Sequence, residues 1–150
     1  MTDLIPESLF IAIDHVGIAV PDLDDAIAFY ESNYGMTVLH SETNEEQGVR
    51  EAMIGYPANA GAAVVQLLAP LNEESTIAKF IGRNGPGLQQ LALRVTDVEA
   101  AMAHLTDRGL RLLYDAPRRG TSDSRINFVH PKDAGGVLLE LVEPHQNAAH

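Results

Sequence analysis

Four polar residues interrupt apolar, strand-like segments of this sequence: His15, Gln66, Gln90 and Glu140. His15 and Gln90 lie 75 positions apart, and Gln66 and Glu140 lie 74 positions apart. A buried polar group without a partner costs about 1–3 kcal/mol, and a lone carboxylate costs more. Such a cost is not expected to recur by chance at two repeat-related pairs. One shared divalent cation would satisfy all four residues, so the spacing predicts a metal site.

The donor atoms of these four residues indicate which metals suit them. One imidazole nitrogen, two amide oxygens and one carboxylate, with two positions left for other ligands, favour an octahedral ion such as Co²⁺, Mn²⁺, Mg²⁺ or Ni²⁺. A tetrahedral structural zinc site is disfavoured because the chain has no cysteine. A non-haem iron oxygenase needs two histidines. Readings without a metal stay open: His15 as a structural histidine, Gln66 as a cross-link between strands, and Glu140 as the partner of an arginine.

The elements that must position these residues repeat with the same spacing. Residues 13–23 are similar to residues 88–98, and residues 62–68 are similar to residues 136–142. Apolar and β-branched runs bounded by turn residues predict a βαβββ unit in each copy. In the first copy we expect a helix that opens at Asp22 and closes at Gly35, and strands at 11–20, 36–41, 49–54 and 62–69. In the second copy we expect a helix at 97–108 and strands at 90–95, 111–114, 125–130 and 137–142.

The duplication lies within one predicted domain, residues 10–143. Its two modules span about 10–70 and 87–143, and a linking helix at about 71–82, capped by Asn72 or Ser75, joins them. A repeat of this length is too long for a solenoid. The predicted fold class is α+β.

The composition excludes several classes of function. The formal net charge is −11 at pH 7, which disfavours binding to nucleic acid. No apolar run approaches the roughly 18 residues that cross a membrane, and the first ten residues do not resemble a signal peptide. We therefore expect a cytoplasmic protein. The only basic cluster, formed by Arg118, Arg119, Arg125 and Lys132, either holds a phosphate-bearing ligand or pairs with local carboxylates.

Five segments spread over most of the chain carry a family resemblance: residues 13–20, 44–51, 65–70, 112–117 and 125–132. In these segments the chain resembles the vicinal oxygen chelate superfamily and, within it, the methylmalonyl-CoA epimerase family. Glu-Gln-Gly-Val at 46–49 and Phe-x-His-Pro-Lys at 128–132 are specific to that branch. The resemblance implies two βαβββ modules that form a cupped mixed sheet around a central metal site.

The resemblance also implies a reaction, a metal and an assembly. The reaction is the interconversion of (2R)- and (2S)-methylmalonyl-CoA by proton transfer at C2 through a metal-stabilised enolate, with Glu51 and Glu140 as acid and base. The family favours Co²⁺, with Mn²⁺, Mg²⁺, Ni²⁺ and Zn²⁺ as alternatives, and a homodimer. The implied ligands are the four repeat-related residues, His15, Gln66, Gln90 and Glu140.

The chain departs from the family at one of these positions. The family usually carries two adjacent histidines where this chain has Gln89 and Gln90. The amide oxygen of Gln90 can still bind a metal, but an amide in place of an imidazole is expected to favour harder ions.

Three other functions stay open. The first is an epimerase for a related acyl-CoA such as ethylmalonyl-CoA. The second is a glyoxalase-like lyase or isomerase, which would require a thiol-cofactor site. The third is a binding protein of the bleomycin-resistance type, which would use an aromatic-lined acidic groove. Only 5% of the residues are aromatic and none is tryptophan, which counts against this third function.

Overall fold

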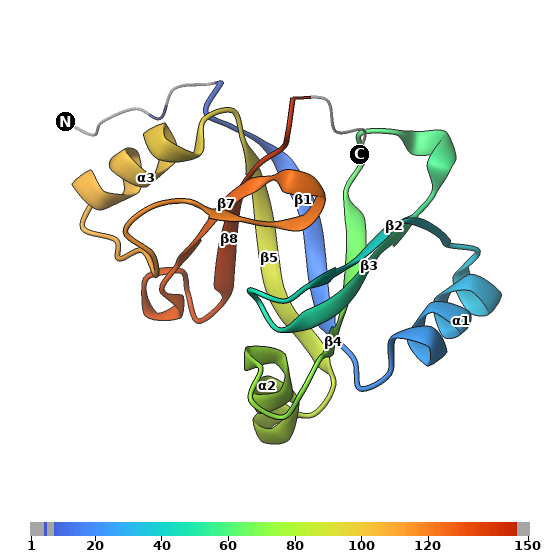
Figure 1. Ribbon diagram of the computed structural model, residues 1–150. Helices are drawn as coiled ribbons and strands as arrows, with labels where there is room; N and C mark the ends of the chain where they lie inside the picture. Colours follow the sequence, from blue (N-terminus) through green and yellow to red (C-terminus); the bar gives the residue numbers. More distant parts are fainter. Residues whose placement is uncertain (1–4, 6–7, 147–150) are drawn as a thin grey trace. The chain divides into compact units, whose positions relative to one another are not determined.

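A computed structural model describes residues 5 and 8–146 of the chain. Two βαβββ series follow one another with a helix between them, in the predicted α+β order (Figure 1). The elements are β1 (Phe10–Ala19), α1 (Leu23–Tyr34), β2 (Thr37–Asn44), β3 (Val49–Gly55), β4 (Val64–Pro70), α2 (Thr76–Asn84), β5 (Gly87–Val95), α3 (Val98–Asp107), β6 (Arg118–Arg119), β7 (Arg125–Val129) and β8 (Leu138–Glu143). Single 3-10 turns lie at Pro57–Asn59, Thr121–Asp123 and Pro131–Asp133.

The described residues form two compact units, which we call the first unit (15–89) and the second unit (5, 8–14 and 90–146). In the first unit the strand order is β2-β3-β4-β1, with β1 parallel to β4 and the other pairs antiparallel. In the second unit the order is β5-β8-β7-β6, with β5 parallel to β8. Each unit therefore builds the same mixed sheet.

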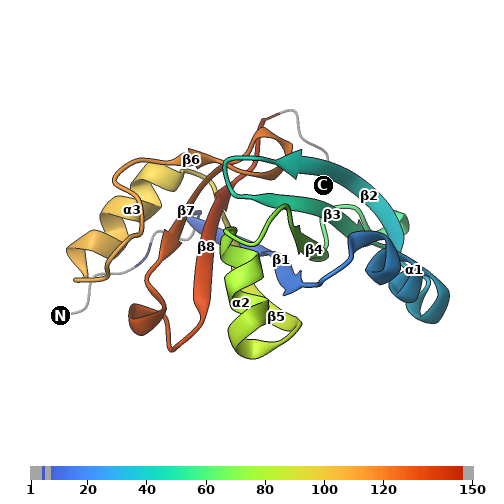
Figure 2. The same cartoon turned by 60° about the horizontal axis from the view of Figure 1, so that its bottom comes forward.

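One helix covers a sheet face in each unit. Helix α1 begins after Asp22, whose side chain accepts a hydrogen bond from the Asp25 backbone N–H at 2.9 Å, and it ends at Gly35 in the left-handed conformation. Apolar residues of α1 pack on β3 and β4 around Leu23, Ile54 and Leu67. Helix α3 packs on β7 and β8 (Figure 2). Burial of these apolar faces is the main source of stability in each unit.

The prediction of a strand at 111–114 is wrong. Leu112 forms one isolated bridge with Val129, and the ladder stops there. The side-chain amide of Asn127, which is fully buried, donates to the Tyr114 carbonyl oxygen at 2.9 Å and accepts from the Tyr114 N–H at 3.2 Å. Because a side chain takes both backbone groups of Tyr114, no backbone ladder forms there. The strand that pairs with β7 is instead the two-residue β6.

The predicted linking helix at 71–82 begins later, at Thr76, and ends at Asn84. The Asn72 side chain accepts from the Glu74 N–H at 2.9 Å, and this local turn keeps residues 71–75 out of the helix. Ser75 caps α2 by accepting from the Ala78 N–H at 3.1 Å, as one of the two predicted caps. No helix within residues 5 and 8–146 has the length and apolar character that a membrane crossing requires.

Candidate active site

All five residues that the sequence singles out for chemistry are buried, with between 2% and 8% of their surface exposed. They are His15, Glu51, Gln66, Gln90 and Glu140. Two of them are carboxylic acids, and a buried carboxylate persists only with polar or charged neighbours. The immediate partners of Glu51 and Glu140 therefore matter most.

In the first unit a glutamine supports a carboxylate. Gln66 on β4 donates a hydrogen bond through Nε2 to Glu51 Oε2 on β3, at 3.2 Å. Met53 lies opposite Gln66 and Glu51 lies opposite Leu68, so Gln66 and Glu51 are diagonal neighbours on one sheet face. His15 on β1 lies two residues before Gly17, the partner of Gln66, and therefore shares that face.

In the second unit the same chemical pair recurs on different strands. Gln90 on β5 donates through Nε2 to Glu140 Oε1 on β8, at 2.8 Å. Glu140 lies opposite Ala92, two residues after Gln90. An ionised carboxylate accepts hydrogen bonds but donates none. The NH₂ group of each glutamine, which is the donor of the amide, must therefore face the carboxylate.

The register of the parallel strands repeats between the units. Gln66 pairs with the residue two after His15, and Glu140 pairs with the residue two after Gln90. The sequence repeat therefore corresponds to a repeat in three dimensions, and His15 and Gln66 of one copy correspond to Gln90 and Glu140 of the other. Glu51 has no acidic counterpart. Ile126, which lies opposite Val142, occupies the corresponding position of the second copy.

Comparisons with known proteins agree with this fold. Residues 14–128 match the Glyoxalase/Bleomycin resistance protein/Dioxygenase superfamily. The chain belongs to this superfamily. The structure of methylmalonyl-CoA epimerase from Mycobacterium tuberculosis is 55% identical, covers 95% of this chain and 93% of that chain, and has a TM-score of 0.88. A methylmalonyl-CoA epimerase in complex with methylmalonyl-CoA and NH4+ is 49% identical over 93% of this chain and 97% of that chain, with a TM-score of 0.86. The ethylmalonyl-CoA/methylmalonyl-CoA epimerase of Cereibacter sphaeroides is 36% identical over 86% of this chain and 95% of its own length.

The donor chemistry of this superfamily member suits a divalent cation. Because Nε2 of Gln66 and Nε2 of Gln90 face carboxylates, Oε1 is the atom of each amide that a cation would bind. In residues 5 and 8–146 no three residues of the types His, Cys, Asp and Glu gather where they could hold a metal. The expected ligand set includes only two residues of these types, His15 and Glu140, so it depends on the two amides.

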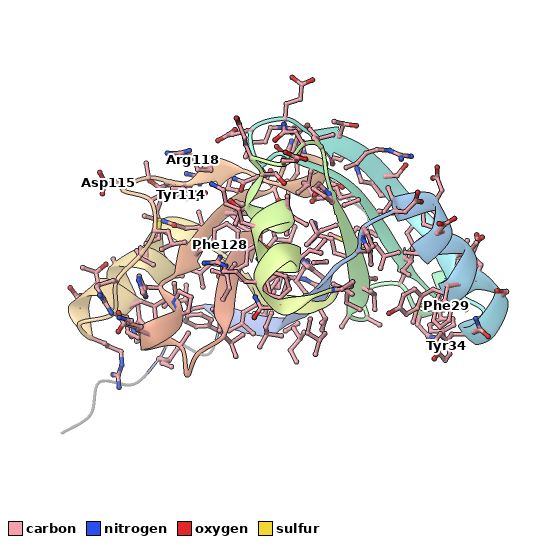
Figure 3. The ribbon with its side chains drawn as sticks, turned by 90° about the horizontal axis from the view of Figure 1, so that it is seen from below. Phe29, Tyr34, Tyr114, Asp115, Arg118 and Phe128 are labelled. Carbon is pink, nitrogen blue, oxygen red and sulfur yellow. The ribbon has the colours of Figure 1, made fainter. Side chains whose placement is uncertain are left out.

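The three arginines of the predicted basic cluster have carboxylate or aromatic partners. Arg119 pairs with Asp123 at 2.6 Å and Arg125 pairs with Glu99 at 2.9 Å. The guanidinium carbon of Arg118 lies 4.1 Å from the centre of the Tyr114 ring (Figure 3). Of the two predicted roles of this cluster, pairing with local carboxylates is therefore confirmed for Arg119 and Arg125.

A bidentate ion pair elsewhere in the second unit gives a pH prediction. Arg111 donates from its side chain to both oxygens of Asp133, and its backbone N–H also donates to Oδ2. These hydrogen bonds lower the pKa of Asp133 from 3.8 to about 2. Because the pKa of Asp133 is lower in the folded protein than in the unfolded chain, the ion pair stabilises the fold at pH values above the unfolded pKa. This stabilisation is lost as the pH falls from 3.8 towards 2.

In an NMR titration we expect Arg111→Leu to raise the pKa of Asp133 only partly, because the backbone donor remains, while Arg108→Leu leaves it near 2. An unchanged pKa in Arg111→Leu would contradict the assignment.

One buried ion pair was not predicted from the sequence. Arg94 Nε donates to Asp14 Oδ1 at 2.8 Å within the second unit, and Asp14 is fully buried. The available signal was an acidic residue on β1 and a basic residue on β5, two strands that are mostly apolar. This pair holds the two strand segments that precede and follow the candidate ligands His15 and Gln90 along the chain.

Proposed function

We propose that this protein is an epimerase that interconverts the C2 epimers of methylmalonyl-CoA. The observation that carries the proposal is the pair of buried carboxylates, Glu51 and Glu140, each bonded to a glutamine amide. Solved methylmalonyl-CoA epimerases of high identity over nearly the whole chain support the choice of substrate.

The proposed reaction is a proton transfer by two bases. The C2 proton of the substrate lies between a carboxylate and a thioester carbonyl. One glutamate removes this proton from one face of C2, and the electron pair moves onto the thioester oxygen as an enolate. The other glutamate donates a proton to the opposite face, which restores the thioester with inverted configuration. The reverse reaction exchanges the roles of Glu51 and Glu140. Each glutamine amide holds one oxygen of its carboxylate, which helps to orient that glutamate.

We further propose His15, Gln66, Gln90 and Glu140 as ligands of a divalent cation, on the basis of their repeat-related spacing and burial. When bound, the cation would supply positive charge next to the oxygen atoms on which the enolate charge develops. Co²⁺ is the ion favoured by the family resemblance. The homodimer and the cytoplasmic location remain predictions from the sequence.

Deuterium incorporation at C2 of methylmalonyl-CoA in D2O, followed by mass spectrometry, tests the proposed activity. We expect rapid incorporation and equilibration of the two epimers by the wild-type protein. The absence of exchange after loading with each of the candidate metals would exclude the epimerase. Ethylmalonyl-CoA should be assayed in parallel, because the Cereibacter sphaeroides relative is named for both substrates.

The Gln90→His variant tests whether Gln90 is a metal ligand. Because imidazole binds Co²⁺, Ni²⁺ and Zn²⁺ better than an amide oxygen does, we expect tighter binding of these ions and a weaker relative preference for Mg²⁺. Competitive dialysis with metal analysis measures both quantities without an activity assay. Gln89→His, at the adjacent position, is the matched control and should leave metal preference unchanged. Equal behaviour of the two variants would remove Gln90 from the ligand set.

A further inference from the structure

The proposed reaction leaves Glu51 with a proton that it must lose before it can act again. When Glu51 removes the C2 proton and Glu140 supplies a proton to the opposite face, Glu51 ends protonated and Glu140 ends ionised. In that form the protein is ready only for the reverse reaction. A second turnover in the same direction requires Glu51 to release its proton to solvent. Because only 3% of Glu51 is exposed, this release needs groups that connect its carboxyl group with water.

A second glutamate lies directly opposite Glu51 on the neighbouring strand. Strand β2 forms the edge of the first unit's sheet and pairs with β3 in antiparallel register, with Glu42 as the partner of Glu51 (Figure 1). Side chains of directly opposed residues share a sheet face, with Cβ atoms about 4.5–5.5 Å apart. Glutamate side chains can bring their carboxyl oxygens together across this gap, and a proton between them relieves the repulsion of like charges. Glu42 can therefore take the proton from Glu51.

Glu42 has a histidine partner that reaches solvent. His40 lies two residues before Glu42 on β2, and its Nε2 atom lies 2.8 Å from Glu42 Oε1. The exposed fraction of the side chain is 15% for Glu42 and 42% for His40. An imidazole ring can accept a proton on one nitrogen and release a proton from the other. The buried base, the half-buried glutamate and the exposed histidine therefore form a continuous series from the site to water.

A β-bulge turns these two side chains towards Glu51. Val38 and His40 pair with adjacent residues of β3, so Leu39 is an extra residue in β2. Val38 packs in the apolar cluster under α1, on the other face of the sheet. Without the bulge, the ladder continued from Val38 would place Glu42 opposite the residue before Glu51, on the face that α1 covers. One inserted residue therefore moves both His40 and Glu42 to the face of the candidate base.

We infer that Glu42 and His40 form a relay that carries protons between Glu51 and solvent, an inference that rests on the proposed epimerase reaction. The Glu51 carboxyl group gives its proton to the Glu42 carboxylate, and Glu42 passes a proton to Nε2 of neutral His40. The imidazolium then releases its Nδ1 proton to water. Glu42 and His40 return to their starting charges, and Glu51 is again a carboxylate. The opposite sequence of transfers supplies a proton to Glu51 for the reverse reaction.

Single-turnover and steady-state rates separate a relay from a role in positioning Glu51. The variants are Glu42→Gln and His40→Gln, whose amides remain polar but do not carry a proton at neutral pH. With protein in excess over methylmalonyl-CoA, Glu51 acts only once, so the rate of epimerisation should stay within about twofold of wild type. In the steady state we expect kcat to fall about tenfold, less than for loss of a general base, because water replaces part of the relay. Proton return follows product release, so KM should fall with kcat and leave kcat/KM unchanged.

Added imidazole provides a second measurement. It can accept the proton from Glu42 in place of the missing ring, so we expect it to restore kcat in His40→Gln. Glu45→Gln, an exposed position in the same hairpin, is the matched control and should keep kcat within about twofold of wild type. Circular dichroism shows whether each variant keeps the wild-type fold.

Each other outcome has a definite meaning. A single-turnover rate that falls as much as kcat would assign Glu42 a positioning role and overturn the relay. An unchanged kcat in both variants, or an equal fall in Glu45→Gln, would overturn it as well, and so would failure of imidazole to restore His40→Gln. In those cases the wild-type protein still exchanges deuterium at C2, so the proposed activity stands. Absence of exchange by the wild-type protein with every candidate metal would instead remove the proposed function and this inference together.

Discussion

Replacing Glu51 with glutamine is expected to lower the rate of methylmalonyl-CoA epimerisation by about 10²–10⁴-fold, the usual contribution of a general base. Glutamine keeps the size of the side chain, and its amide can still contact Gln66, but it does not accept the C2 proton. If the two glutamates serve opposite faces, the remaining Glu140 still exchanges the C2 proton of one epimer. Deuterium incorporation measured separately for each epimer should therefore persist for one of them and fail for the other.

The control for this prediction is Glu45→Gln, the same chemical change at an exposed position of the same β2–β3 hairpin. It should leave both rates within about twofold of wild type, because surface substitutions rarely perturb a distant site. Full epimerase activity in Glu51→Gln would remove this residue from the mechanism. Equal loss of exchange for both epimers would contradict the assignment of Glu51 and Glu140 to opposite faces of C2. It would still show that Glu51 is essential.

Replacing Arg94 with methionine is expected to lower the free energy of unfolding by about 3–5 kcal/mol, because it removes one partner of a buried ion pair. The Asp14 side chain has no exposed surface, and Arg94 is 16% exposed, so the carboxylate cannot turn to water when the guanidinium is lost. Methionine retains much of the aliphatic stem of arginine, which separates the loss of charge from the loss of packing. Urea denaturation followed by circular dichroism measures the change.

Two further variants make this test specific. In the double variant Arg94→Met with Asp14→Leu, both charges are absent, and we expect most of the lost stability to return. Arg50→Met breaks an exposed pair with Asp24 at 3.3 Å and should cost less than about 1 kcal/mol. Equal destabilisation by Arg94→Met and Arg50→Met would show that burial of Asp14 does not govern the effect.

Much of the architecture follows from local patterns in the sequence. Apolar periodicity and turn residues predicted β3 as 49–54, where the structure has Val49–Gly55, and α3 as 97–108, where it has Val98–Asp107. Asp22 and Gly35 mark the ends of α1 because capping and the left-handed conformation each favour a few residue types. The prediction of a strand at 111–114 was wrong because a residue outside that segment decides its hydrogen bonds. Its apolar pattern is present, but Asn127, 13 residues after Tyr114, occupies the backbone groups that a ladder would need.

The residues of the candidate site could be predicted from the sequence, but the contacts between them could not. The repeat in the sequence was sufficient to single out His15, Gln66, Gln90 and Glu140, because a duplicated fold places equivalent positions in equivalent environments. The pairing of Gln66 with Glu51, and of Gln90 with Glu140, depends on strand register and was decided only by the tertiary structure. Only that register shows that Ile126 occupies the position equivalent to Glu51 in the second copy.

Periodicity along one strand therefore indicated most of the elements of this protein and the buried candidates for its site. It did not determine what each buried residue touches. A contact across a sheet depends on how segments far apart in sequence are aligned, and shifting a strand by one residue moves every side chain to the other face. The ion pair between Arg94 and Asp14, which lie 80 positions apart in the sequence, depends on such an alignment. For that reason the metal-ligand candidates could be predicted from the sequence, whereas the contacts that support them required the folded chain.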